Sequence, residues 1–447
     1  MRLKKIYFFL ILAVIGTTIV SWFNVNSCLI ILLVMVRLAD GGRPAEALRT
    51  AFFNPYFLAY FSLFAMEALG LLYTHDLYTA YKHVESKATL VAIPFVLCSG
   101  KVIEDRTQFI RLLWAYCWLL VAACLLCLVV AMIRLRDAGH FGVFFYHSLT
   151  EVLGMNAVFF SAYVVIALIF LLSPDGKGRF RGILAGFFTV MMILLSSKLL
   201  LVWLSVVFVV YLRRRNGVRL TARQYAGLAA LVVFGMGALA LTKNPVGQRY
   251  RDILHDNFRY IGAHRLAPQD RFNGVSLRLL IWRFAGEIVT EEKAWVVGVT
   301  AGDSQDLLNR KYLAANIHPR YLGYNFHNQF IEIFVRSGAV GLGIFLLATG
   351  LLVQQARRTG SRAGWLILGM LLLLALTEST LEMQHSLFLF CFFPLVFGLG
   401  SVRAIIPSGL RNGPIRYAKQ GPGSGPIRYA KIPQVSSQPP SAHDSSR

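Results

Sequence analysis

Charged residues are scarce in this chain of 447 residues, because only 15% are Asp, Glu, Lys or Arg while 56% are apolar. Ordinary soluble domains contain about 25% charged and roughly 45–50% apolar residues, so this composition argues strongly against a water-soluble fold. Acidic residues are especially few, since 22 Asp and Glu face 45 Lys and Arg and leave a formal charge of +23. Such an excess is typical of proteins that meet nucleic acid or an anionic lipid surface.

Cysteines are also few, and all six lie within apolar runs, where a thiol behaves as a small hydrophobic group. A disulfide framework is therefore not indicated. Cys124 and Cys127 have the spacing of a redox or zinc pair, but no histidine or charged residue lies beside them. We expect these thiols to pack in a hydrophobic core, and we expect no metal and no cofactor.

The chain contains many long apolar runs, which predict an all-α, polytopic membrane protein of about twelve transmembrane helices. Several of these runs are shorter than the roughly 20 residues that a hydrocarbon core requires, so their boundaries are approximate. The expected spans lie near 6–23, 26–38, 55–73, 88–100, 109–133, 152–173, 182–196, 198–212, 225–242, 328–353, 364–377 and 387–402.

Basic residues in the connectors predict the orientation of these spans, because short cytoplasmic loops carry an excess of Lys and Arg. With the N-terminus inside, the cytoplasmic connectors hold 20 basic residues before the tail and the opposite short connectors hold 5. Both ends of the chain are therefore expected in the cytoplasm, with helices 1–9 in residues 1–242 and helices 10–12 in 328–403. Residues 404–447 are rich in Pro, Gly and Ser, repeat GPIRYAK, and predict a disordered basic cytoplasmic tail.

One connector, residues 243–327, is long enough to fold by itself, and we expect function to lie there. Residues 243–326 contain twelve basic and eight acidic residues, and nine of the basic residues are arginines. Arginine offers a planar, permanently charged fork that binds phosphate in two places. A lipid-linked phosphate fits this non-cytoplasmic loop better than nucleic acid does, and a basic solvated cap is the simpler alternative.

Two further patterns near this loop suggest structure. Arg278 and Trp282 lie four residues apart in an expected helix and share one face, which would place the indole at the headgroup level and the guanidinium near phosphate. Glu332 and Arg336 have the same spacing in the tenth span, so we expect them to neutralise each other. Glu67 in the third span has no evident partner nearby in the sequence.

His327 and Asn328 are followed by nine residues, Gly338, two residues and Gly341. This pattern resembles the His-[Asn/Ser/Gln]-x9-Gly-x-x-[Gly/Thr/Tyr] signature of the bacterial O-antigen ligase family. A dozen spans, a large late loop and an Arg-x-x-x-Trp helix about fifty residues before the histidine agree with that resemblance. The glycines, together with Gly343, are expected to let neighbouring helices approach closely.

The resemblance implies a metal-independent glycosyltransferase of the bacterial inner membrane, with its active site facing the periplasm. Its donor would be undecaprenyl-diphosphate-linked O-antigen, its acceptor the lipid A core, and its surroundings membrane lipids. His327 matches the catalytic base, and Arg278 matches a diphosphate-binding arginine. Lys198 stands where relatives often have another arginine, and keeps the charge without the bidentate fork. Arg265 is a further candidate for the diphosphate, and Asn328, Gln329, Trp282 and Tyr324 are expected to support the site.

Part of this chemistry follows without the family. A sugar hydroxyl is a weak nucleophile, so a neutral histidine can accept its proton during attack on the anomeric carbon. The positive end of the following helix would favour the neutral imidazole. An O-antigen polymerase or a protein O-oligosaccharyltransferase would use the same donor with another acceptor. A transporter of an anionic solute is the alternative from a different class, although we find no internal repeat.

Overall fold

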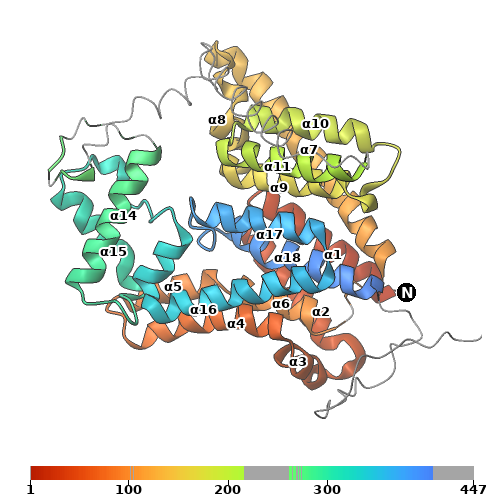
Figure 1. Ribbon diagram of the computed structural model, residues 1–447, viewed down its shortest axis with the longest axis horizontal. Helices are drawn as coiled ribbons and strands as arrows, with labels where there is room; N and C mark the ends of the chain where they lie inside the picture. The colour runs from red at the N-terminus through yellow and green to blue at the C-terminus, as the bar shows by residue number, and fades with distance from the viewer. Residues whose placement is uncertain are drawn as a thin grey trace, which may run out of the picture. The chain divides into compact units, whose positions relative to one another are not determined.

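The computed structural model describes residues 2–215, apart from 101 and 104, and residues 261–405, apart from 264, 268, 269, 271 and 273 (Figure 1). Within these ranges the chain is helical and has no strand, which confirms the all-α prediction. The expected span 225–242, the loop residues 243–260 and the tail beyond 405 lie outside the described residues.

Each expected span other than 225–242 contains an α-helix. The described α-helices are α1 (Arg2–Ile19), α2 (Phe23–Ala39), α3 (Pro44–Phe52), α4 (Pro55–Leu69), α5 (Leu77–Ser86), α6 (Thr89–Cys98), α7 (Arg106–Ala138), α8 (Tyr146–Thr150), α9 (Ala157–Leu172), α10 (Arg181–Leu195), α11 (Lys198–Arg215), α14 (Gly274–Glu291), α15 (Thr300–Ala314), α16 (Gln329–Thr359), α17 (Arg362–Ala375) and α18 (Gln384–Ile405). Short 3-10 turns occur at Asp40–Gly42, Gly70–Leu72, Phe141–Phe144, Glu151–Leu153, Pro174–Gly176 and Pro319–Tyr321.

Three stretches of the described chain are long and apolar enough to cross a membrane: Pro55–Leu72, Arg106–Ala138 and Gln329–Thr359. Two bent pairs of helices, Phe23–Ala39 with Pro44–Phe52 and Tyr146–Leu153 with Ala157–Leu172, raise this number to five if each pair is one span. The other apolar helices are shorter than a straight span requires. The total of about twelve spans therefore stays a prediction.

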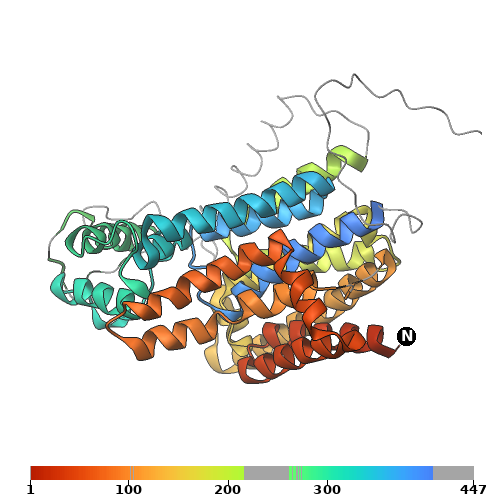
Figure 2. The ribbon, with the colours of Figure 1, turned by 90° about the horizontal axis from the view of Figure 1, so that it is seen from below.

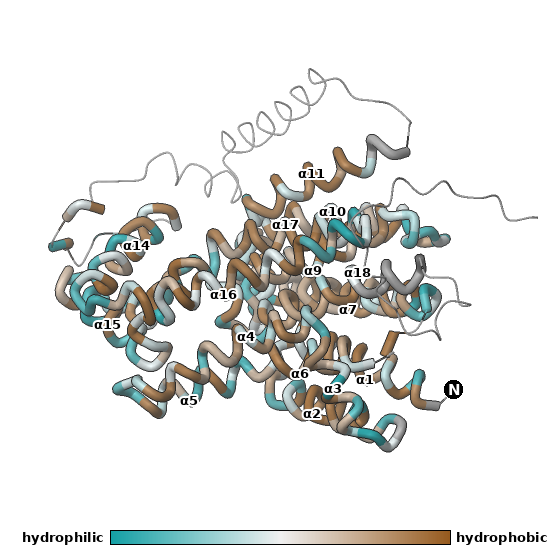
Figure 3. Tube along the Cα trace, turned by 60° about the horizontal axis from the view of Figure 1, so that its bottom comes forward, coloured by the Kyte–Doolittle hydropathy of each residue, from teal (hydrophilic) through white to brown (hydrophobic). Residues whose placement is uncertain are grey.

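A large hydrophobic core joins the first two hundred residues to the last helices. Helix α9 lies inside it, and every residue from Ala157 to Leu171 is buried. Helix α4 packs along α16, and α6 packs against α18, so segments far apart in the sequence lie side by side (Figure 1). Figure 3 shows how hydrophobic residues dominate α4, α9, α16 and α17, whereas α5, α14 and α15 are mixed. Cys117, Cys124 and Cys127 are buried in this core, as expected.

A second, smaller hydrophobic cluster holds α14 and α15 together and extends to the first turns of α16 through Val335. Two of its buried aromatic members, Phe284 and Tyr312, meet edge to face with 6.0 Å between ring centroids. Figures 1 and 2 both show α14 and α15 beside one end of α4 and α16. This cluster therefore places the helices of the long connector next to His327, at the start of α16.

Helix α16 is kinked at Gly338, whose φ of +61° and ψ of −160° are not helical. The turn at 295–298 packs into the kink: Trp295 and Val296 accept hydrogen bonds from the N–H groups of Ala339 and Val340, at 2.8 and 3.1 Å. A Cβ on Gly338 would lie 2.2 Å from the carbonyl carbon of Val296. Gly338, the first glycine of the signature, therefore leaves room for the backbone of another segment. We had expected it to allow close packing of two helices.

The other two glycines of this region differ from each other. A Cβ on Gly341 would lie 2.7 Å from the Sδ of Met66 in α4, so the expectation of a close helix approach is confirmed there. A Cβ on Gly343 would meet no atom within 4 Å, so that expectation is wrong for Gly343.

We expect Gly338→Ala to destabilise the fold by at least about 2 kcal/mol, because a side chain there is strained and also clashes with backbone. Gly343→Ala is the matched control, since it enters open space in the same helix. Alanine is a better helix former by roughly 1 kcal/mol, so this control should be neutral or slightly stabilising. Thermal unfolding of the two variants in detergent tests this prediction, and equal melting temperatures would contradict it.

Candidate functional site

His327 lies directly before α16, between two asparagines that fix its backbone. Its φ is +48°, in the left-handed region, and its N–H donates to Asn325 Oδ1 at 3.0 Å. Asn328 caps the helix, because its Oδ1 accepts from the N–H groups of Phe330 and Ile331 at 2.9 and 3.2 Å. The side chain of His327 remains 26% exposed, so the imidazole is held in place and still accessible.

Glu378 lies against this histidine, although sequence reasoning did not single it out. Its Oε2 is 3.3 Å from His327 Nδ1, and its side chain is only 11% exposed. Glu378 belongs to the segment 376–383 between α17 and α18. A carboxylate at Nδ1 favours the tautomer that carries hydrogen on this nitrogen, and Nε2 is then the nitrogen that can accept a proton.

Arg278 projects from the second turn of α14 toward the same carboxylate. Its Nη2 is 2.6 Å from Glu378 Oε1, its Nε donates to the Thr377 carbonyl at 2.9 Å, and its Nη1 donates to the Gly274 carbonyl at 2.6 Å. These bonds use three of the five N–H groups of a guanidinium, so within the described part of the chain one N–H remains on each terminal nitrogen. Arg278 is thus brought to His327, as the resemblance implies, with Glu378 between the two.

Two aromatic residues support the histidine. Trp282 donates from Nε1 to the Phe326 carbonyl at 3.0 Å, so its indole is fixed to the residue before His327 and does not simply anchor α14 at lipid headgroups. The Tyr324 ring meets the His327 imidazole edge to face at 5.8 Å between centroids. The Tyr324 carbonyl accepts from the Tyr312 hydroxyl at 3.1 Å.

Asn328 and Gln329 connect the histidine to the segment that carries Glu378. Asn328 Nδ2 donates to the Leu376 carbonyl at 3.0 Å, and Gln329 Oε1 accepts from the Leu381 N–H at 2.6 Å. Both side chains are buried. They therefore position the two halves of the site by bonding to protein backbone.

Arg265 and Lys198 are the two remaining candidates for binding the diphosphate, and they lie in different parts of the fold. Arg265 is exposed, and the next residue, Leu266, is held by a hydrogen bond from its N–H to the Ala315 carbonyl at 2.9 Å. Lys198 begins α11, two residues after Ser196, whose left-handed φ of +51° ends α10. A role for either residue in donor binding stays a prediction.

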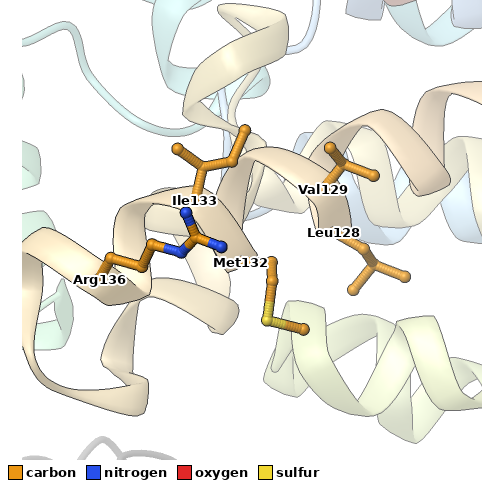
Figure 4. Close-up of a pocket in the computed structure, with 5 residues that line it drawn as sticks. All are labelled: Leu128, Val129, Met132, Ile133 and Arg136. Atoms are coloured by element: carbon orange, nitrogen blue, oxygen red, sulfur yellow. The ribbon is translucent and has the colours of Figure 1, made fainter.

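A separate groove lies along α7 and is lined by Leu128, Val129, Met132, Ile133 and Arg136 (Figure 4). All five residues belong to one helix, and the groove includes none of the residues described above. The chemistry gathered around His327 is therefore distinct from it.

Comparison with known proteins shows a similarity over part of the chain. A family model described as O-antigen ligase matches residues 182–346, from the start of α10 to the middle of α16. This part of the chain, residues 182–346, is similar to the O-antigen ligase family. Members of this family are membrane glycosyltransferase-like enzymes, and the apolar helices described above agree with a membrane protein. No curated protein matches the chain.

The residues matched to the O-antigen ligase family include His327, Arg278, Trp282 and Gly338, but neither Glu378 nor the segment around it. The arrangement can act on a hydroxyl group: Glu378 orients the imidazole, Nε2 accepts a proton, and Arg278 offers N–H groups and positive charge nearby.

Proposed function

We propose that this protein is an O-antigen ligase that transfers O-antigen polysaccharide from undecaprenyl diphosphate to the lipid A core at the periplasmic face of the inner membrane. The observation that supports this most strongly is the contact of Glu378 with both His327 and Arg278 at the start of α16. It combines a base, a group that orients the base, and a cation for a leaving diphosphate.

In the proposed reaction, His327 Nε2 takes the proton of an acceptor hydroxyl as its oxygen attacks the anomeric carbon of the donor. The new bond joins this oxygen to the anomeric carbon, and the bond from that carbon to the diphosphate oxygen breaks. The diphosphate leaves with the electron pair. A single displacement of this kind inverts the anomeric carbon, and Glu378 stabilises the imidazolium that forms.

The leaving diphosphate gains negative charge, which fixed donors and cations stabilise most effectively because they need no rearrangement during the reaction. Arg278 is such a donor, since three hydrogen bonds to protein hold its guanidinium while one N–H on each terminal nitrogen remains. Arg278, with Arg265 as a further candidate, would carry out the task that a divalent metal performs elsewhere, so the proposed transfer needs no metal.

We expect Arg278→Ala to lower kcat/KM for the lipid-linked donor by about 10- to 150-fold, the effect of losing a hydrogen bond to a charged group. Arg278→Lys should restore only part of this loss, because an ammonium lacks the fork. Arg310→Ala is a suitable control, since Arg310 is 72% exposed and pairs with Asp306 on α15. A transfer assay with purified donor gives the comparison, and equal behaviour of the Arg278 and Arg310 variants would exclude donor binding by Arg278.

Complementation of a ligase deletion in the native host tests the proposed function itself. Wild-type protein should restore a ladder of polysaccharide-bearing lipopolysaccharide on gels. A strain with full-length lipopolysaccharide despite deletion of the gene would exclude the ligase. Loss of chain length with a single repeat still attached would instead indicate a polymerase, and loss of glycan from a protein would indicate an oligosaccharyltransferase.

A further inference from the structure

The segment 376–383 carries Glu378 but has little regular structure of its own. It lies between the last residue of α17, Ala375, and the first residue of α18, Gln384. Its internal backbone bonds are few and local, such as the one from the Glu382 N–H to the Ser379 carbonyl at 3.2 Å. The position of the Glu378 carboxylate therefore depends on side chains that other elements supply.

Lys87 supplies one of these contacts from the junction between α5 and α6. Its side chain is 1% exposed, and its Nζ lies 2.7 Å from Glu382 Oε1. The same ammonium donates to the Leu381 carbonyl, so it holds both the backbone and the side chain of the segment. A lysine buried this deeply is almost never found without such partners.

Arg336 and Glu332 of α16 complete the cluster around the segment. Arg336 bridges two carboxylates, with Nη1 2.7 Å from Glu382 Oε2 and Nη2 2.6 Å from Glu332 Oε1. The expected pairing of Glu332 with Arg336 is therefore confirmed. Glu332 Oε2 accepts from the Ser379 hydroxyl at 2.8 Å, one residue after Glu378. The cluster thus holds the segment on both sides of Glu378.

Two more titratable groups face this cluster. Glu67 of α4 is buried, and the positive charge of Arg336 acts on its carboxyl group. With Glu332 and Glu382, the cluster therefore contains three carboxylates. His83 of α5 lies 3.8 Å from Glu382. Burial and the charge of Arg336 lower the pKa of His83 to about 4, so this imidazole is neutral near pH 7. The cations of the cluster are therefore Lys87 and Arg336.

The charges explain why Glu382 stays ionised. Burial raises the pKa of its carboxyl, but Arg336 and Lys87 together hold that pKa below its usual range. Buried ion pairs contribute little net stability, because desolvation offsets their attraction, whereas removing one partner leaves a costly unpaired charge. Without Lys87, a single guanidinium would face three carboxylates, and the least costly response would be movement of the segment that carries Glu382.

We propose that Lys87 is a positioning residue for glycan transfer: by holding Leu381 and Glu382 it fixes the segment 376–383 so that Glu378 faces His327 and Arg278. This inference rests on the proposed function of His327. Lys87 and the segment both lie outside residues 182–346, the part that matches the family model.

Lys87→Met keeps most of the side chain and removes the charge. We expect it to lower kcat by about 10²-fold, the effect of a displacement of roughly 1 Å at a catalytic group, with a small change in donor KM. Lys87→Arg should recover part of the activity because it retains a donor and a charge. Lys82→Met is the matched control on α5, since Lys82 is 53% exposed and pairs with Glu85 at the surface, and it should behave as wild type.

A double-mutant cycle separates positioning from general destabilisation. If Lys87 acts through Glu378, Lys87→Met should lower kcat by less than about threefold in a protein that already carries Glu378→Gln. If Lys87→Met lowers kcat as much in the Glu378→Gln protein as it does in the wild-type protein, the proposal is overturned. Hydrogen exchange gives a readout independent of activity: peptides covering 376–383 should exchange faster in Lys87→Met than in Lys82→Met, and equal protection would also overturn it.

The combined variant Lys87→Met with Glu382→Gln covers the case in which Lys87→Met alone does not fold. It removes both charges of the pair, which is far less costly than leaving one unpaired. We expect this variant to fold and to transfer slowly, and wild-type kcat would overturn the proposal. Failure of the proposed function would be seen separately, because wild-type protein would then not glycosylate the lipid A core. The double-mutant cycle does not depend on that acceptor, since it can be measured with any acceptor that the protein glycosylates.

Discussion

Substitution of His327 should abolish glycan transfer, with a loss of about 10²–10⁴-fold that is typical of removing a general base. His327→Ala removes the imidazole but also places alanine at a φ of +48°. His327→Asn avoids this difficulty, because asparagine tolerates left-handed backbone better than alanine and offers no base of suitable strength. Both variants should bind donor and fold, and neither should produce a lipopolysaccharide ladder in the native host.

His318→Ala is the matched control for this prediction. His318 belongs to the same connector, and its Nδ1 accepts a hydrogen bond from the Arg320 N–H at 3.1 Å. Its loss should leave the ladder intact. Transfer by the His327→Asn variant at the rate of the His318→Ala variant would remove His327 from the reaction while leaving the fold unchanged.

The fold was largely predictable because apolar runs in a chain with so little charge almost all become helices. The number of spans could not be settled in this way. Helices such as Arg362–Ala375 are apolar but too short to cross alone, and Phe23–Ala39 with Pro44–Phe52 bends by 108°. The pattern of hydrophobic residues alone does not show whether such a bent pair forms one span or two.

Candidate site residues could be proposed from the sequence where they match a recognised pattern. The pattern from His327 to Gly341 and the Arg278 helix were both found from the sequence alone. Glu378, 51 residues from His327, was missed because it belongs to no recognised pattern, whereas Arg278, at a similar separation, was found through the resemblance. A signal did exist: the predicted topology places the connector between spans 364–377 and 387–402 on the same side as the long loop. Glu378 and Glu382 are the acidic residues of that connector, together in TESTLE.

The role of Gly338 at the kink of α16 was also not predictable from the sequence. A glycine in an apolar helix predicts close packing, and Gly341 follows that rule against Met66. Gly338 instead accommodates the turn at 295–298, which comes from the long connector. The turn could not be assigned to the kink from sequence, because the two are forty residues apart and no local pattern joins them.

Replacement of Glu378 is the second change with a large expected effect. Glu378→Gln should lower kcat by on the order of 10²–10⁴-fold, because a glutamine amide can donate to His327 Nδ1. The imidazole would then carry its hydrogen on Nε2, the nitrogen that must accept the proton from the acceptor hydroxyl. The carboxylate that stabilises the imidazolium would be lost as well. Glu378→Asp keeps the charge but shortens the side chain, so its loss should be smaller.

Donor binding distinguishes this role from a merely structural one. Arg278 keeps its hydrogen bonds to the Thr377 and Gly274 carbonyls when Glu378 becomes glutamine, so donor KM should rise less than in Arg278→Ala. Glu291→Gln is the control, since Glu291, the last residue of α14, is 59% exposed and pairs with Lys311 of α15. Steady-state transfer kinetics with purified donor decide the matter. Wild-type kcat in the Glu378→Gln variant would mean that His327 needs no carboxylate to orient it, and a rise in donor KM with unchanged kcat would assign Glu378 to donor binding through Arg278.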